Sequence, residues 1–63
     1  MTELETLYQN IADTLEQGVT DVEKFEAGNM SAGTRVRKTM QTVKDLAQKV
    51  RVTVQEQKNA VVA

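Results

Sequence analysis

Phe25-Glu26-Ala27-Gly28-Asn29-Met30-Ser31 is the stretch of sequence that decides the fold, because it interrupts an otherwise continuous helical pattern. Gly28 tolerates the left-handed backbone that often follows a helix, and Asn29 tolerates it next best. Ser31 is a suitable N-cap for a second helix. A connection of about four residues is typical of two antiparallel helices. The chain is therefore predicted to be all-α, an antiparallel two-helix hairpin with helices over about 3–27 and 31–59.

The segment before the turn has the apolar spacing of a helix. It begins with Thr2 and Glu5, whose separation of three residues predicts a capping box. Apolar side chains then follow at alternating spacings of four and three, which is a heptad seam. The seam consists of Leu4, Tyr8, Ile11, Leu15, Val22 and Phe25, with Leu7 and Val19 at its edges.

Gly18 fills the one gap in this seam and has two interpretations. A glycine in the middle of a helix costs about 1 kcal/mol relative to alanine. It is compensated if the missing side chain lets Val43 of the second helix approach closely. Alternatively, the helix kinks or breaks near residues 18–20, where Thr20-Asp21-Val22-Glu23 resembles a second capping box. We favour the close approach.

The segment after the turn repeats the four-and-three alternation. Its seam consists of Val36, Met40, Val43, Ala47, Val50, Val54 and Val61, broken only at Gln57, with Leu46 at its edge. Arg51-Val52-Thr53-Val54 alternates as a strand does, but four residues within a long helical pattern are predicted to stay helical. Aligning the two seams pairs residues whose numbers add up to about 61 or 62. The predicted pairs are Phe25 with Val36, Val22 with Met40, Leu15 with Ala47, Ile11 with Val50, and Tyr8 with Val54.

The length of 63 residues predicts a single domain, 1–63, that is marginally stable alone. The chain has no Cys and no His, so disulfides and ordinary zinc sites are excluded as stabilising devices. Leu7, Val19, Met40 and Leu46 would stay partly exposed in one hairpin. We therefore expect homo-oligomers, a dimer or tetramer that forms a helical bundle, in preference to an isolated hairpin.

The same composition argues against several classes of function. Without His or Cys there is no general base or nucleophile of the usual kind, and no Gly-rich phosphate loop is present. We expect neither an enzyme nor a protein with a metal, cofactor or small-molecule substrate. No apolar run approaches the roughly 18 residues of a membrane span, and no signal peptide is visible, so a cytoplasmic protein is expected.

Charge is distributed unevenly along the chain. Residues 1–27 carry seven acids and one base, and residues 28–63 carry seven bases and two acids. Arg37, Lys44, Arg51 and Lys58 are each seven residues apart, which places them on one stripe of a helix. In one interpretation this stripe pairs with Glu5, Glu16 and Glu23 of the first helix or of a partner. In the other it contacts nucleic-acid phosphates.

The turn and the start of the second helix contain a more specific pattern. It consists of Lys24, Glu26, Gly28, Asn29, Ala32, Arg35 and Arg37, continued by Leu46-Ala47-Gln48-Lys49-Val50-Arg51. Over about residues 20–58 the sequence resembles the bacterial linker-histone-like nucleoid proteins. This resemblance implies non-specific DNA binding and chromosome compaction in the nucleoid. It implies DNA contact most directly for Arg35, Arg37 and Lys38, and less directly for Lys44, Lys49, Arg51 and Lys58.

One departure from the longer members bears on affinity. Those proteins carry a Lys-, Ala- and Pro-rich tail, whereas this sequence ends at Val61-Val62-Ala63. Because non-specific affinity grows with the number of phosphates neutralised, weak binding is expected unless an oligomer aligns several basic stripes. The alternative function is a protein-interaction scaffold whose basic stripe forms structural salt bridges only.

Overall fold

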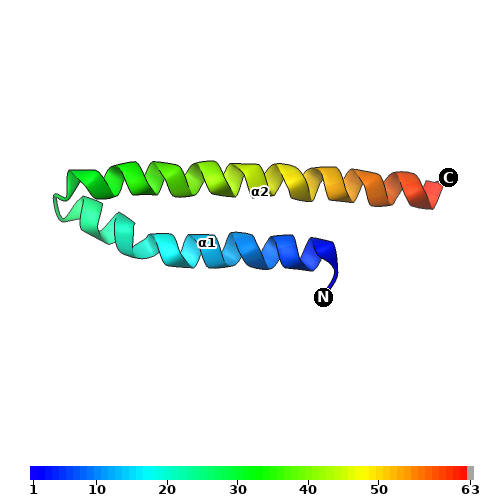
Figure 1. Cartoon of the computed structure of the whole chain (residues 1–63), viewed down its shortest axis with the longest axis horizontal. Helices are drawn as coiled ribbons and strands as arrows, with labels where there is room; N and C mark the ends of the chain where they lie inside the picture. The colour runs from blue at the N-terminus through cyan, green and yellow to red at the C-terminus, as the bar shows by residue number, and fades with distance from the viewer. Residues whose placement is uncertain (63) are drawn as a thin grey trace.

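The chain forms two antiparallel helices joined by a tight turn (Figure 1). The computed structural model describes residues 1–62, with side chains described for residues 1–60. Helix α1 spans Glu3–Glu26 and helix α2 spans Met30–Val62. The predicted all-α hairpin is confirmed, and α2 extends beyond its predicted end at residue 59. Neither described helix has a stretch long and apolar enough to cross a membrane.

Helix α1 begins at the predicted capping box. The Thr2 hydroxyl oxygen accepts the Glu5 backbone N–H at 3.1 Å, and the Glu5 carboxylate accepts the Thr2 backbone N–H at 2.9 Å. These bonds satisfy two of the donors that a helix N-terminus leaves without partners. They fix the first residue of α1 about where the sequence predicts it.

The turn ends α1 and begins α2 within three residues, Ala27-Gly28-Asn29. Gly28 has a φ of 106°, a backbone conformation that L-residues with side chains rarely adopt. The backbone N–H groups of Gly28 and Asn29 donate to the carbonyl oxygens of Phe25 and Lys24, both at 3.0 Å. These bonds give partners to two carbonyl oxygens in the last turn of α1 at the point where the chain reverses.

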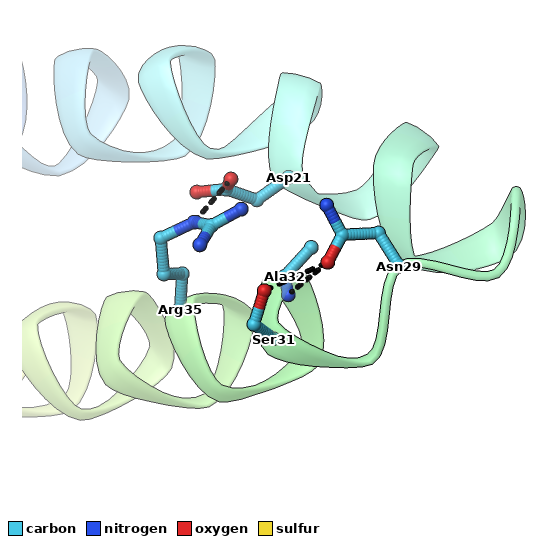
Figure 2. Close-up of polar contacts among 5 residues, drawn as sticks. All are labelled: Asp21, Asn29, Ser31, Ala32 and Arg35. Carbon is cyan, nitrogen blue, oxygen red and sulfur yellow. Dashed lines mark hydrogen bonds and ion pairs between the residues drawn. The ribbon is translucent and has the colours of Figure 1, made fainter.

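Asn29 is the residue that caps α2, and the predicted cap, Ser31, is wrong. The Asn29 side-chain oxygen accepts the Ala32 backbone N–H at 3.3 Å and the Ser31 hydroxyl at 2.8 Å (Figure 2). The helix starts one residue before Ser31, which therefore lies within its first turn. Asn and Ser are about equally good N-caps, so the short turn decides between them.

The two helices pack in a register different from the predicted one. Gly18 faces Thr39, where an added Cβ would lie 3.1 Å from Thr39 Cγ2. Phe25 covers Gly33, where an added Cβ would lie 2.8 Å from two ring carbons. The residue numbers in these contacts add up to 57 and 58, instead of about 61 or 62. The predicted pair of Phe25 with Val36 would require a wider connection than the three-residue turn.

The rows that face each other are smaller and more polar than the predicted seams. Facing positions are the less exposed ones, and in α1 they are Leu4, Leu7, Ile11, Thr14, Gly18 and Asp21. In α2 they are Ala32, Gly33, Val36, Thr39, Val43, Leu46, Ala47, Val50 and Thr53. Leu7 and Leu46, predicted at the edges, thus lie between the helices. Several side chains of the predicted seams are instead exposed, namely Tyr8, Leu15, Val22, Phe25, Met40 and Val54.

Gly18 has the packing role that we favoured, but with a different neighbour. It is buried against Thr39 and not against Val43. Helix α1 continues through residues 18–20 without a break. Figure 1 shows that the C-terminal part of α1, next to the turn, bends towards α2.

The hairpin buries very little apolar surface. Among the residues whose side chains are described, Ala32 is the one buried hydrophobic side chain, and no large side chain is fully buried. Burial of apolar area is the main favourable term in folding. A single hairpin therefore lacks a core of the usual kind. Its conformation depends largely on the helix caps, the turn and the packing of small residues.

The turn predicts a chirality-dependent effect on stability. Gly28→Ala is expected to lower the free energy of unfolding by about 1 kcal/mol, because an L-residue is strained at this φ. A synthetic chain with D-alanine at position 28 is the matched control, since the opposite chirality favours positive φ. Thermal melts by far-UV circular dichroism should separate the two variants. Equal losses in both would contradict the role assigned to this conformation.

The capping box predicts a pH effect. Hydrogen bonding to the Thr2 backbone N–H, and then to its side chain, lowers the pKa of Glu5 below its ordinary value. A lowered pKa means that the cap stabilises α1 above the ordinary Glu range and is lost as pH falls through the lowered value. By NMR titration, the Glu5 midpoint should rise slightly in Thr2→Ala and further in Thr2→Pro. Proline lacks the N–H yet fits the φ of −74° at this position. An unchanged midpoint in Thr2→Pro would contradict the assignment.

Candidate nucleic-acid interface

Helix α2 carries all seven basic residues predicted to contact DNA. All of them are exposed, and none is buried between the helices. They are Arg35, Arg37, Lys38, Lys44, Lys49, Arg51 and Lys58. Helix α1 carries one base, Lys24, among seven acids. The hairpin thus has a basic helix and an acidic helix side by side.

Four of the bases form a straight row, which we call the basic ladder: Arg37, Lys44, Arg51 and Lys58. Because α2 is one uninterrupted helix from Met30 to Val62, the seven-residue spacing puts them on one stripe about 10.5 Å apart. Met40 lies three residues after Arg37 and four before Lys44, so it neighbours the ladder on the helix surface. Val54 lies in the same way between Arg51 and Lys58.

The other three bases lie away from the ladder. Arg35 Nε donates to Asp21 Oδ1 at 2.8 Å, which ties α2 to α1 beside the turn (Figure 2). Lys38 lines a shallow polar groove between the helices together with Asp21 and Thr42. Lys49 lines a second shallow groove, which also includes Glu3. Arg35 is therefore engaged by a carboxylate, whereas the ladder is not.

Asp21 contacts a residue of the candidate site in a way that the sequence did not reveal. Its position suggested part of a capping box inside α1, and no local signal identifies Arg35, fourteen residues away, as its partner. Only the register of the hairpin brings them together. The pair is 46% exposed at the arginine and 21% at the aspartate, so water screens it.

The structure bears on the two interpretations of the ladder. Among the described residues, the ion pair of Arg35 with Asp21 is the one salt bridge. Glu5, Glu16 and Glu23 do not pair with the ladder inside the hairpin, although the sequence made this a possible role. The ladder residues are therefore available to groups outside the hairpin. Within the described residues, no group of three or more acidic side chains is placed to hold a metal ion.

The chain is thus a small two-helix hairpin with one acidic helix and one exposed basic helix. A comparison with models of protein families matches residues 5–60 to the family described as Histone H1-like protein Hc1. The chain belongs to this histone-like family, which confirms the resemblance seen in the turn and the basic helix. Comparisons with curated proteins and with solved structures give no match.

The ion pair between the helices predicts a small, salt-dependent coupling. A double-mutant cycle of Asp21→Asn and Arg35→Gln should give about 0.5 kcal/mol in chemical denaturation, the range of exposed pairs. The coupling should shrink as salt is raised. The matched control pairs Asp21→Asn with Arg37→Gln, which lies outside the contact and should show none. Equal coupling in both cycles would contradict a specific pair.

Proposed function

We propose that this chain is a nucleoid-associated protein that binds double-stranded DNA without sequence preference through α2. The observation that supports this best is the placement of all seven candidate bases on one exposed helix of a chain that belongs to a histone-like family. The proposal covers DNA compaction or organisation in the nucleoid. It includes self-association, since one hairpin offers few phosphate contacts.

The basic ladder is the element to which we assign the phosphate contacts. Its four side chains span about 31 Å along α2. A row of point charges on a rigid helix can follow a phosphate backbone, and each contact releases a counterion. Arg35 is assigned a smaller part than the family resemblance implies, because Asp21 already accepts its Nε–H. Lys38 and Lys49 each line a groove between α1 and α2, and we assign them supporting contacts.

The acidic helix determines which side of the hairpin faces DNA in this proposal. Residues 1–27 and 28–63 carry net charges of about −6 and +5, counted from Asp, Glu, Lys and Arg. A chain with a net charge of −1 binds a polyanion only if it turns one side towards it. In this orientation α2 faces the DNA and α1 faces away. The seven acids then limit how closely a second DNA duplex approaches from the α1 side.

The helices provide no means of reading base edges. The exposed side chains of the ladder are Arg and Lys. At the start of either described helix, no cluster of Asn or Gln among basic residues forms a surface that could contact the edges of DNA bases. The two aromatic side chains, Tyr8 and Phe25, both lie on α1, whereas the ladder lies on α2. Stacking on single-stranded bases is therefore not part of the proposal.

The salt dependence of binding tests the ladder. The triple variant Arg37→Gln, Lys44→Gln and Arg51→Gln should bind duplex DNA more weakly at low salt. The slope of log affinity against log salt should fall in magnitude by about 2 to 3, since each phosphate contact contributes about 0.9. Fluorescence anisotropy over a range of salt concentrations measures both quantities.

A control with the same net charge separates contact from general repulsion. Gln9→Glu, Asn10→Glu and Gln17→Glu add three negative charges to exposed positions of α1 and leave α2 intact. This variant should weaken binding but keep the slope of the unmodified chain. If the unmodified chain does not shift duplex DNA at micromolar concentration and about 50 mM salt, DNA binding is wrong. If both triple variants show the same slope, the contacts lie outside the ladder.

A further inference from the structure

An apolar face remains uncovered on one side of the hairpin. It consists of Tyr8, Leu15, Val19 and Val22 of α1 and Met40 and Val54 of α2. Tyr8, Val19 and Met40 are 64%, 52% and 48% exposed. A shallow groove on this face is lined by Leu15, Val19 and Val22 together with Met40, so the two helices present one common surface.

The hairpin also exposes more surface than a compact protein of its mass. Its accessible surface is 5034 Å², whereas a compact monomer of 7.0 kDa exposes about 4,000 Å². The excess is about 1,000 Å². A standard interface removes about 800 Å² from each partner. The excess therefore matches what one partner of similar size would cover.

Charged edges of opposite sign border the apolar face. On α2 the basic ladder neighbours Met40 and Val54 at spacings of three and four residues. On α1 Glu16 lies three residues before Val19 and Glu23 four after it, so both neighbour Val19. Glu5 similarly neighbours Tyr8. Lys24, the one base of α1, is two residues after Val22 and points to another side of the helix.

A second copy can lie face to face on this surface in two symmetric ways. A twofold axis parallel to the helices puts α1 on the partner's α2, with the acidic edge against the basic ladder. A twofold axis across the helices puts α1 on the partner's α1, with acid against acid and base against base. Like charges in contact oppose association, whereas opposite charges fix orientation.

We infer that a second copy of this chain covers the apolar face, with α1 of each copy antiparallel to α2 of the other. This inference rests on the self-association proposed above and specifies its face and orientation. The result is a four-helix bundle with Leu15, Val19, Val22 and Met40 in its core. Tyr8 and Val54 extend the contact towards the end away from the turn.

The register of the hairpin specifies which charges meet. Residue numbers of facing positions within a hairpin add up to about 57, and an axis parallel to the helices keeps these heights. Glu16 then lies level with Gln41 of the partner subunit, between the partner's Arg37 and the partner's Lys44. Glu5 lies next to the partner's Arg51. The ladder thus neutralises the partner's acids at its inner side and keeps its outer side for phosphates.

Association without DNA tests the apolar face. Sedimentation velocity over a concentration series should show a dimer for the unmodified chain, and its melting temperature should rise with concentration. Val19→Lys should raise the dimer dissociation constant about tenfold or more. Thr20→Lys is the matched control, since it adds the same charge one residue away, about 100° around α1 and outside the apolar face, and should leave the constant nearly unchanged. A monomer at all concentrations, or equal effects of both variants, would overturn the inference.

Charge reversal tests the orientation. Glu16→Lys with Glu23→Lys should raise the dissociation constant about tenfold, and so should Arg37→Glu with Lys44→Glu. Combining all four changes should restore it. The arrangement of α1 on the partner's α1 predicts no such loss. In that dimer acids already face acids, and reversing them only exchanges one like-charged pair for another. Full restoration supports the inference, and no restoration overturns it.

A variant with the same net charge shows that position matters. Thr6→Lys, Asp13→Lys and Thr20→Lys also add four positive charges, on a stripe nearly opposite Leu15 and Val22. This variant should leave the dimer nearly intact. Since no DNA is present in these measurements, their failure leaves the DNA proposal standing. Loss of DNA binding alone would likewise leave the dimer standing.

Discussion

The tight turn at Gly28 and Asn29 is the constraint on which the rest of the structure depends. The positive φ of Gly28 reverses the chain, and the Asn29 side chain starts the next helix at once. A turn this short places Phe25 over Gly33 and Gly18 against Thr39. These contacts determine which row of each helix faces inward. The turn therefore also determines which rows remain outside, where the apolar face and the basic ladder lie.

The sequence was sufficient for the fold and insufficient for the register. Its heptad spacing, capping box and glycine turn predicted both helices, and the structure confirms them. Each helix, however, carries two neighbouring apolar rows, and pattern analysis selects the more apolar one. The helices instead close over Gly18, Ala32 and Thr39, because small side chains allow the approach that the turn imposes. The periodicity of apolar residues does not reveal this preference for small side chains between the helices.

The candidate site could likewise be predicted from the sequence only where it does not depend on the register. Which residues are basic, and that four share one stripe, follows from spacing on any helix. That Arg35 is engaged by Asp21 depends on the register, so no pattern in the sequence separates Arg35 from Arg37. Family membership supports the histone-like character of the whole hairpin, while the geometry ranks the bases within it. In the proposed assembly, the edges of the ladder serve two partners of the same charge, acidic side chains and phosphates.

The near absence of buried side chains has a consequence for how such a sequence changes over time. In a globular domain the core restricts most substitutions, because a lost or added methylene is felt by many neighbours. Here the strict requirements fall on a few sites: the positive φ of Gly28, the space at Gly33 and the close approach at Gly18. Nearly every other described side chain reaches water. The fold itself therefore restricts few of the charges on α2, so the proposed affinity for DNA can change by single substitutions that leave the hairpin intact.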